Sequence, residues 1–97
     1  MNMHNPPHPS EFIKEIYLEP FDLPSSELAQ KLKISTSTFL RFMNAEINIS
    51  PDMALRLSKV LGRSPESWLL MQDNYDLWKA RQSINLDEFE TLVFPVH

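Results

Sequence analysis

The spacing of apolar and polar positions predicts two short helices joined by a tight turn within residues 25–44. The helices cover residues 26–32 and 36–44, and in each one the apolar side chains lie three or four positions apart. Ile34 is an apolar plug in the turn between them. The inward positions are Leu28, Ala29 and Leu32 in the first helix, and Phe39, Phe42 and Met43 in the second.

The outward face of the second predicted helix carries mostly small or hydrogen-bonding side chains. A short helix with such a face, supported by a helix of small residues, has the shape that enters a DNA major groove. Arg41 could contact guanine with two hydrogen bonds, and Leu40 could contact a thymine methyl. The alternative is a solvated helix face without function. The base-reading candidates are Thr36, Ser37, Leu40 and Arg41.

Other polar residues of this stretch are candidates for contacts with the DNA backbone. Ser26 at a helix start and Asn44 at a helix end could position phosphates through their side chains and backbone N–H groups, although each could equally be a cap only. Four bases, Lys31, Lys33, Arg56 and Lys59, could add diffuse attraction or be ordinary surface residues. The backbone-contact candidates are Ser25, Ser26, Lys33, Thr38 and Asn44.

Start and stop signals divide the rest of the chain into further helices. Residues 1–8 form a proline-bearing arm that is expected to be flexible, and a helix follows over residues 9–18. Ser50-Pro51-Asp52 and Ser64-Pro65-Glu66 each combine a capping hydroxyl, a first-turn proline and an acid. Gly62, between these two starts, is expected to end a helix as its left-handed cap residue.

The last predicted helix runs to about residue 82 and has a wider apolar face than one small core needs. Aromatic residues at helical spacing are far more often core or dimer interface than base-stacking groups. The tail, residues 83–97, ends in ETLVFPV, which predicts a short strand without a partner in the chain. The same tail of a second copy could pair with it across a two-fold axis, or the tail could lie unpaired on its own domain. The dimer-interface candidates are Trp68, Leu70, Leu77, Trp78, Leu92 and Phe94.

The composition bounds the class of protein. The chain has 97 residues, enough for a single domain, with 42% hydrophobic residues and one glycine. It has no cysteine, which excludes disulfides and thiolate metal sites and fits a reducing cytosol. Neither a membrane-spanning run nor a signal peptide is present, so we expect a cytoplasmic regulator rather than an enzyme. His4, His8 and Glu11 form an unconvincing metal site, and all three histidines lie near the chain ends, so the sequence predicts no catalytic residue, metal, cofactor or small-molecule substrate.

The charge is unevenly distributed along the chain. The net charge is −4, which by itself argues against nucleic-acid binding. Residues 25–63, however, carry six bases and three acids, a local charge of +3, whereas residues 64–97 carry two bases and six acids. A local positive face is compatible with DNA binding, but one copy would bind weakly.

Three segments in a fixed order resemble the HigA-type antitoxins, also called VapI-related proteins, of the XRE helix-turn-helix family. HPSE at residues 8–11 looks like the HPGE opening of that family. PDMALRLSKVLG at 51–62 is similar to the helix after its helix-turn-helix. SPESWLLMQ at 64–72, with YDL at 75–77, looks like its SPEFWLNLQ and YDL motifs. The resemblance covers about residues 8–82, nearly the whole chain.

The resemblance implies an all-α, five-helix, lambda repressor-like DNA-binding domain, here with a short strand-like tail. It implies a homodimer on a palindromic operator, usually that of its own toxin–antitoxin operon, and neutralisation of an mRNA-cleaving HigB-type toxin by direct binding. The chain departs from the family pattern where glycine is replaced by Lys33, serine by Leu40, and Gly-Lys by Ala45-Glu46. Pro24 and Ser25 also replace a serine cap and a longer polar residue. These changes bear on operator affinity more than on the fold.

Three functions therefore compete at the level of sequence. The first is a dimeric, operator-binding repressor that is also an antitoxin. The second is an XRE-type transcriptional regulator without a toxin partner. The third is a protein-interaction module whose helix-turn-helix no longer binds DNA. A neighbouring gene for a small basic toxin separates the first from the second, and a salt-dependent mobility shift separates both from the third.

Overall fold

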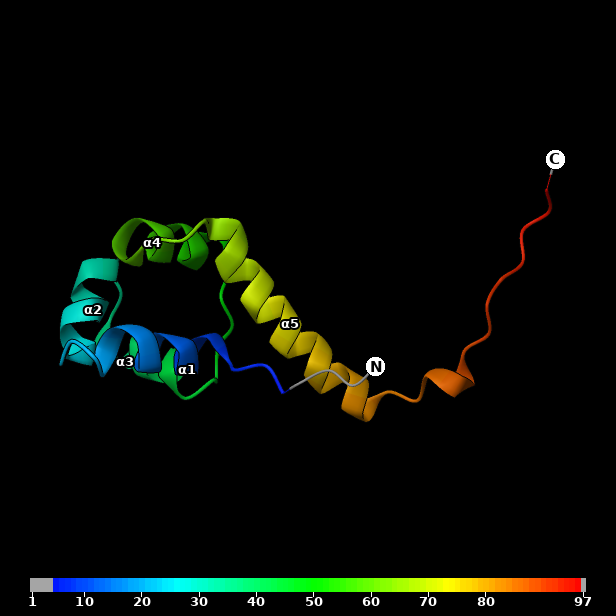
Figure 1. The fold of residues 1–97 in the computed structure, drawn as a ribbon, viewed down its shortest axis with the longest axis horizontal. Helices are drawn as coiled ribbons and strands as arrows, with labels where there is room; N and C mark the ends of the chain where they lie inside the picture. Colours follow the sequence, from blue (N-terminus) through cyan, green and yellow to red (C-terminus); the bar gives the residue numbers. More distant parts are fainter. Residues whose placement is uncertain (1–4, 97) are drawn as a thin grey trace.

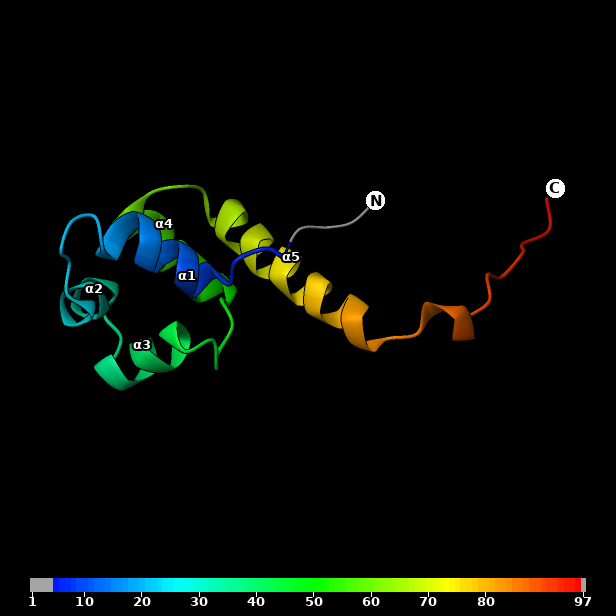
Figure 2. The ribbon, with the colours of Figure 1, turned by 60° about the horizontal axis from the view of Figure 1, so that its bottom comes forward.

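The fold is all-α, and its helices begin where the sequence signals predicted. The computed structural model describes residues 5–96. Helices α2 and α3 form the helix-turn-helix, α1 and α4 pack beside them, and α5 starts against α4 and runs away from the other helices (Figures 1 and 2). No helix in this part of the chain is both long and apolar enough to cross a bilayer. The elements are α1 (Pro9–Ile13), a π-helical turn η1 (Lys14–Leu18), α2 (Ser25–Leu32), α3 (Thr36–Met43), α4 (Pro51–Leu61), α5 (Pro65–Ser83) and a 3-10 turn η2 (Leu86–Glu88).

The core gathers side chains from all five helices. Phe39 and Phe42 of α3 are fully buried, as is Trp68 of α5. The predicted inward faces of the two short helices are confirmed, since α2 turns its apolar side chains to the same core. The remaining buried apolar residues are Ile13, Leu18, Leu28, Ala29, Leu32, Ile49, Met53, Ala54 and Leu57. This core fixes the angle at which α3 presents its outer face.

The two serine–proline helix starts are confirmed. Ser50 accepts a hydrogen bond from the N–H of Met53, and Ser64 accepts one from the N–H of Ser67. Gly62 does have a positive φ, of 97°, but its ψ of −167° lies outside the left-handed helical region. The expectation of a left-handed cap was therefore wrong in detail, because the short connection to α5 needs an extended ψ at this position.

His8 differs from the flexible arm in which the sequence placed it. The side chain is 2% exposed and caps α1, because its Nδ1 accepts hydrogen bonds from the N–H of Ser10, at 3.1 Å, and from the Ser10 hydroxyl, at 2.8 Å. The ring lies edge-on to Tyr75 of α5, with centroids 4.9 Å apart, and 5.9 Å from the ring of Phe42. His8 therefore belongs to the core, and it joins α1, α3 and α5. His4 of the same arm lies outside the described residues.

Trp68 is not available to a partner, which corrects its assignment to a dimer interface. Its ring is fully buried, and its indole N–H donates to the carbonyl oxygen of Gly62 at 2.9 Å. The rings of Phe12 and Tyr17 pack against it, with centroids 5.9 and 6.3 Å away. Trp78, one of the other aromatic candidates, is only half-buried. The two tryptophans of α5 thus have different environments.

The predicted C-terminal strand is absent from the described residues. After η2 the chain is extended and exposed, and it leads away from the helices rather than lying on them (Figure 1). Leu92 is 75% exposed and Phe94 is 73% exposed. A strand needs a neighbouring strand for its backbone groups, and residues 5–96 of one copy offer none. The tail does not lie on its own domain, and its pairing with the tail of a second copy stays a prediction.

Candidate nucleic-acid interface

The turn of the helix-turn-helix is held by Lys33 in a left-handed conformation, with φ 59° and ψ 45°. The N–H of Lys33 donates to the carbonyl of Gln30, and the N–H of Ile34 donates to the carbonyl of Ala29, both at 3.1 Å. This is the hydrogen-bond pattern of a Schellman cap, in which glycine is the usual residue. A lysine there costs roughly 1–2 kcal/mol relative to glycine, and its side chain is exposed beside α3.

Arg56 of α4 holds this turn in place, a role that the sequence did not indicate. Its guanidinium donates from Nη1 to the carbonyl oxygens of Leu32, at 2.9 Å, and Lys33, at 3.1 Å. Its Nε lies 2.6 Å from Oδ1 of Asp52, one turn earlier in α4. Arg56 therefore satisfies the carbonyls at the end of α2 and compensates for part of the strain at Lys33. The spacing of Asp52 and Arg56, four residues apart, was the only sequence signal for the pair.

The outer face of α3 is open to solvent and polar apart from one leucine. The four base-reading candidates, Thr36, Ser37, Leu40 and Arg41, are all exposed, with Leu40 at 48%. They share this face because Phe39 and Phe42 turn the opposite side of α3 into the core. The structure thus brings the four candidates together on one accessible surface, and their contact with bases remains a prediction.

Ser35 and Thr38 are hydrogen-bonded to each other at the start of α3. The Ser35 hydroxyl caps the helix by accepting from the N–H of Thr38 at 3.1 Å, and it donates to the Thr38 hydroxyl oxygen at 2.8 Å. It also lies 3.2 Å from the Ser37 hydroxyl. The sequence predicted Thr38 as a contact to the DNA backbone and did not indicate the capping role of Ser35. Because the Thr38 hydroxyl accepts this bond, its own O–H stays available to donate to a phosphate oxygen.

Arg41 forms an ion pair within the chain that would compete with a contact between its guanidinium and a base. Its Nε lies 3.9 Å from Oε1 of Glu46, and both side chains are more than half exposed. The loop brings Glu46 back because its N–H donates to the carbonyl of Arg41 at 2.9 Å, while Ala45 has a positive φ of 61°. Exposed pairs of this kind contribute at most about 1 kcal/mol, so DNA can displace Glu46. Lys33 and Ala45 thus put non-glycine residues in left-handed conformations on both sides of α3.

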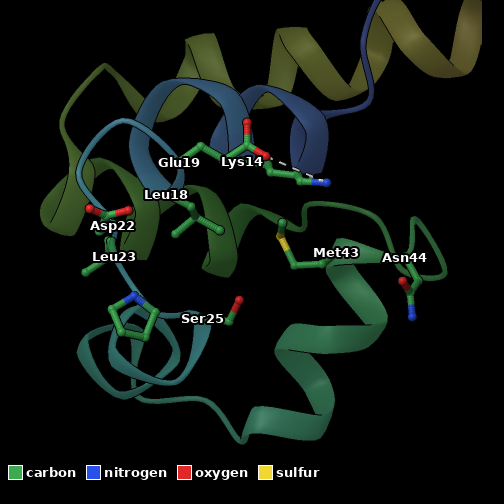
Figure 3. Close-up of a pocket in the computed structure, with 9 residues that line it drawn as sticks. Lys14, Leu18, Glu19, Asp22, Leu23, Ser25, Met43 and Asn44 are labelled. Carbon is green, nitrogen blue, oxygen red and sulfur yellow. Dashed lines mark ion pairs between the residues drawn. The ribbon is translucent and has the colours of Figure 1, made fainter.

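Two of the backbone-contact candidates, Ser25 at the start of α2 and Asn44 after α3, line one hollow. Figure 3 shows Ser25 and Met43 directed toward it, with Lys14 and Glu19 on its opposite side. The hollow measures about 420 Å³ and also borders on Asn44. No side chain caps α2, because Pro24 precedes it, so its first N–H groups are open to an anion. Lys14 pairs with Glu19 at 4.0 Å, and Asp22 adds a second acid, so this hollow is a poor anion site by itself.

Gln72 of α5 fixes the loop that follows α3, another role that sequence reasoning missed. The side chain is 3% exposed, and its Oε1 accepts from the N–H of Ile49 at 2.9 Å. Its Nε2 donates to the carboxamide oxygen of Asn48 and to the carboxylate of Asp76, both at 3.1 Å. α5 therefore positions the loop beside the recognition helix without belonging to its outer face. The SPESWLLMQ motif contained Gln72, but nothing in its spacing identified a buried amide.

The pKa of His8 is lowered because burial disfavours the imidazolium form, although Asp76 and Glu11 oppose the shift and Lys79 adds to it. The N–H of Ser10 donates to Nδ1, so the neutral ring carries its proton on Nε2. Nε2 is buried and has no hydrogen-bond partner within the described chain. The first turns of α1 therefore depend on a neutral histidine in contact with α3 and α5.

Comparison with known proteins now places this arrangement in a family. The sequence profile of the family described as "Helix-turn-helix" matches residues 13–68, more than half of the chain. Virulence-associated protein I of Dichelobacter nodosus is 40% identical over 82 residues, which span 81% of this chain and 76% of the relative.

Solved structures agree with this assignment over almost the full length. Antitoxin GraA in complex with its operator is 34% identical, with a TM-score of 0.82 that covers 97% of this chain and 98% of GraA. The Pseudomonas aeruginosa antitoxin HigA with the higBA promoter is 32% identical, with a TM-score of 0.77 over 95% of this chain and 99% of HigA. The expected absence of enzyme activity follows from this membership. The chain belongs to the XRE-type helix-turn-helix family that includes the HigA antitoxins and virulence-associated protein I.

Proposed function

We propose that this protein is the antitoxin of a HigBA-type module, acting in the cytoplasm as a dimeric repressor of its own operon and as the inhibitor of an mRNA-cleaving toxin. The observation that carries the DNA-binding part is the exposed polar face of α3 on the positively charged segment 25–63. The full-length similarity to antitoxins solved with operator or promoter DNA supports it. Arg41 is the residue we assign to guanine reading, after displacement of Glu46.

Dimerisation is proposed from an exposed apolar stripe on α5. Leu70 and Leu77 of α5, together with Ile84 directly after its last residue, follow one another at seven-residue spacing and are 59%, 49% and 47% exposed. Seven-residue spacing keeps apolar side chains on one seam of a helix, where a second helix can cover them. A dimer also doubles the number of phosphate contacts, which offsets the weak positive charge of a single copy. Trp78 follows Leu77 in α5, and the exposed Leu92 and Phe94 add further apolar surface in the tail.

The toxin partner is proposed from the family alone and needs its own test. The product of a small basic reading frame beside this gene is expected to arrest growth when it is expressed alone, and to lose toxicity and co-purify when this chain is expressed with it. Arrest that persists with both proteins present would leave an XRE-type regulator without a toxin partner as the better description.

A mobility shift on the DNA upstream of the gene tests the DNA-binding proposal. We expect a specific complex whose affinity falls steeply with salt, and Arg41→Ala to weaken it by roughly 10- to 100-fold. Lys79→Ala, which removes the same charge from α5, serves as the matched control and should weaken binding far less. Equal losses for both variants would contradict base reading by α3, and no complex at low salt would favour the protein-interaction module.

A further inference from the structure

A second hollow lies between the end of α2 and the outer side of α4, and we call it the basic groove. It measures about 380 Å³, and its lining contains four bases and no acid. No carboxylate of the described chain pairs with Lys31, Lys33 or Lys59, whereas Arg56 is engaged with Asp52. Three of its residues are apolar, including the 62% exposed Leu55. The lining residues are Lys31, Leu32, Lys33, Leu55, Arg56, Lys59 and Val60.

The chain's own tail, residues 84–96, has the complementary chemistry. It contains three acids and no lysine or arginine, so its charge is opposite to that of the groove. Its apolar side chains are among the most exposed of the molecule, with Val93 at 90%. The acids Asp87, Glu88 and Glu90 precede the apolar run that contains Leu92 and Phe94. An acidic, apolar segment is the kind of peptide that a basic groove with apolar walls binds, since both kinds of side chain find partners.

The geometry favours the tail of a second copy over the chain's own tail. The groove and the tail lie at opposite ends of the molecule, with α5 between them (Figure 1). α5 has 19 residues and is about 28 Å long, whereas the tail reaches at most about 43 Å at roughly 3.3 Å per residue. The chain's own tail would use most of that reach to retrace α5. Antiparallel pairing of two α5 stripes brings Ile84 of the second copy opposite Leu70, near the start of α5, where α4 packs.

We infer that the basic groove binds the acidic, apolar tail of the partner copy in the proposed homodimer. This inference rests on the proposed dimer. It places the tail of one copy against α2 and α4 of its partner, rather than against the tail of its partner. The carboxylates of the tail meet Lys31, Lys33 and Lys59, and its apolar side chains cover Leu55 and Val60. Lys33 is thereby assigned to the tail instead of the DNA backbone, for which it was a candidate. A toxin that binds mRNA is basic, so it does not match this groove. DNA phosphates match the positive charge of the groove, but they would leave its apolar side chains uncovered.

Because the chain has no cysteine, cross-linking provides a test without background. Leu55→Cys in a size-tagged chain and Phe94→Cys in an untagged chain are mixed and treated with a short bis-maleimide. We expect the mixed product between the two chains to exceed either like-with-like product several-fold. The double variant Lys31→Glu/Lys59→Glu should reduce the mixed product and weaken dimer association by roughly tenfold. Combining this variant with Asp87→Lys, Glu88→Lys and Glu90→Lys should restore both the mixed cross-linked product and the dimer association.

Each other outcome overturns the inference. A dominant product between two Phe94→Cys chains would mean that tails pair with each other. A double-cysteine chain that closes on itself as a monomer would assign the groove to its own tail. An unchanged cross-link in Lys31→Glu/Lys59→Glu, combined with weaker DNA binding, would assign the groove to DNA. Sedimentation keeps the two proposals apart, because a dimer without the mixed cross-link contradicts only this inference, whereas a monomer also contradicts the proposed dimer.

Discussion

The two halves of α5 differ in how deeply their large side chains are buried. In the first half Trp68 is fully buried and Gln72 is 3% exposed, and both make hydrogen bonds to other elements. In the second half Leu77 is 49% exposed, and Ile84 and the tail that follow the helix are exposed throughout. One side of the start of α5 thus completes the core, whereas Leu70 on its other side and the end of the helix stay uncovered. Substitutions in the two halves should therefore affect different equilibria, folding and association.

The largest expected effect follows from Trp68→Ala in the buried half. Removing this ring leaves a cavity against Phe12 and Tyr17 and an unpaired carbonyl at Gly62, so we expect a loss of about 3–5 kcal/mol in the free energy of unfolding. Urea unfolding followed by circular dichroism measures it. Trp78→Ala removes the same side chain from the exposed half and is the control. Similar losses in monomeric protein would contradict the division of α5.

The second effect concerns association rather than folding. Leu77→Glu puts a charge into the centre of the exposed stripe, so we expect the dimer dissociation constant to rise roughly 100-fold. Stability of the monomer should change by less than about 0.5 kcal/mol, because the site is solvated in one copy. Sedimentation velocity over a concentration series measures the dimer dissociation constant. Phe21→Glu, which adds the same charge at an exposed ring outside α5, should leave the dimer intact, and an equal effect there would contradict an α5 interface.

The third effect tests how the buried half of α5 serves the interface with DNA. Gln72→Ala leaves the N–H of Ile49 without its partner and frees the loop after α3, at a cost of about 1–3 kcal/mol. Operator affinity should fall with it, although Gln72 does not lie on the outer face of α3. Gln82→Ala, at an exposed position of the same helix, is the matched control for both measurements. Unchanged hydrogen exchange at Ile49 in Gln72→Ala would show that the loop does not depend on this amide.

The smallest effect is a pH dependence from His8. Because the pKa in the folded state is lowered, the unfolded state binds the proton first as the pH falls through about 6.5. Stability is therefore full above pH 6.5 and declines as the pH falls toward the folded pKa. Asn in His8→Asn can accept the N–H of Ser10 without titrating, so it should flatten this slope in thermal unfolding between pH 7 and pH 5.5. An equal slope in the variant would contradict a contribution of His8 to the pH dependence.

The local features of the fold could be predicted from the sequence alone. Ser50 and Ser64 act on N–H groups only three residues away, and the apolar spacing of α2 and α3 is a property of neighbouring residues. The family resemblance, in which glycine is usual at the position of Lys33, indicated the left-handed conformation found there. The family resemblance rested on local motifs of the same kind, and it was confirmed.

Only the tertiary structure decided which residues complete and support the site. His8 meets Phe42 and Tyr75, Arg56 reaches the carbonyl of Leu32, and Gln72 reaches the N–H of Ile49. These contacts join residues more than twenty positions apart, so no local period reports them. Trp68 and Trp78 lie on one side of the same helix, and burial distinguishes them because α5 leaves the core before its end. Local sequence signals were enough for the helices and the family, whereas long-range packing set which surfaces are buried, strained or left for a partner.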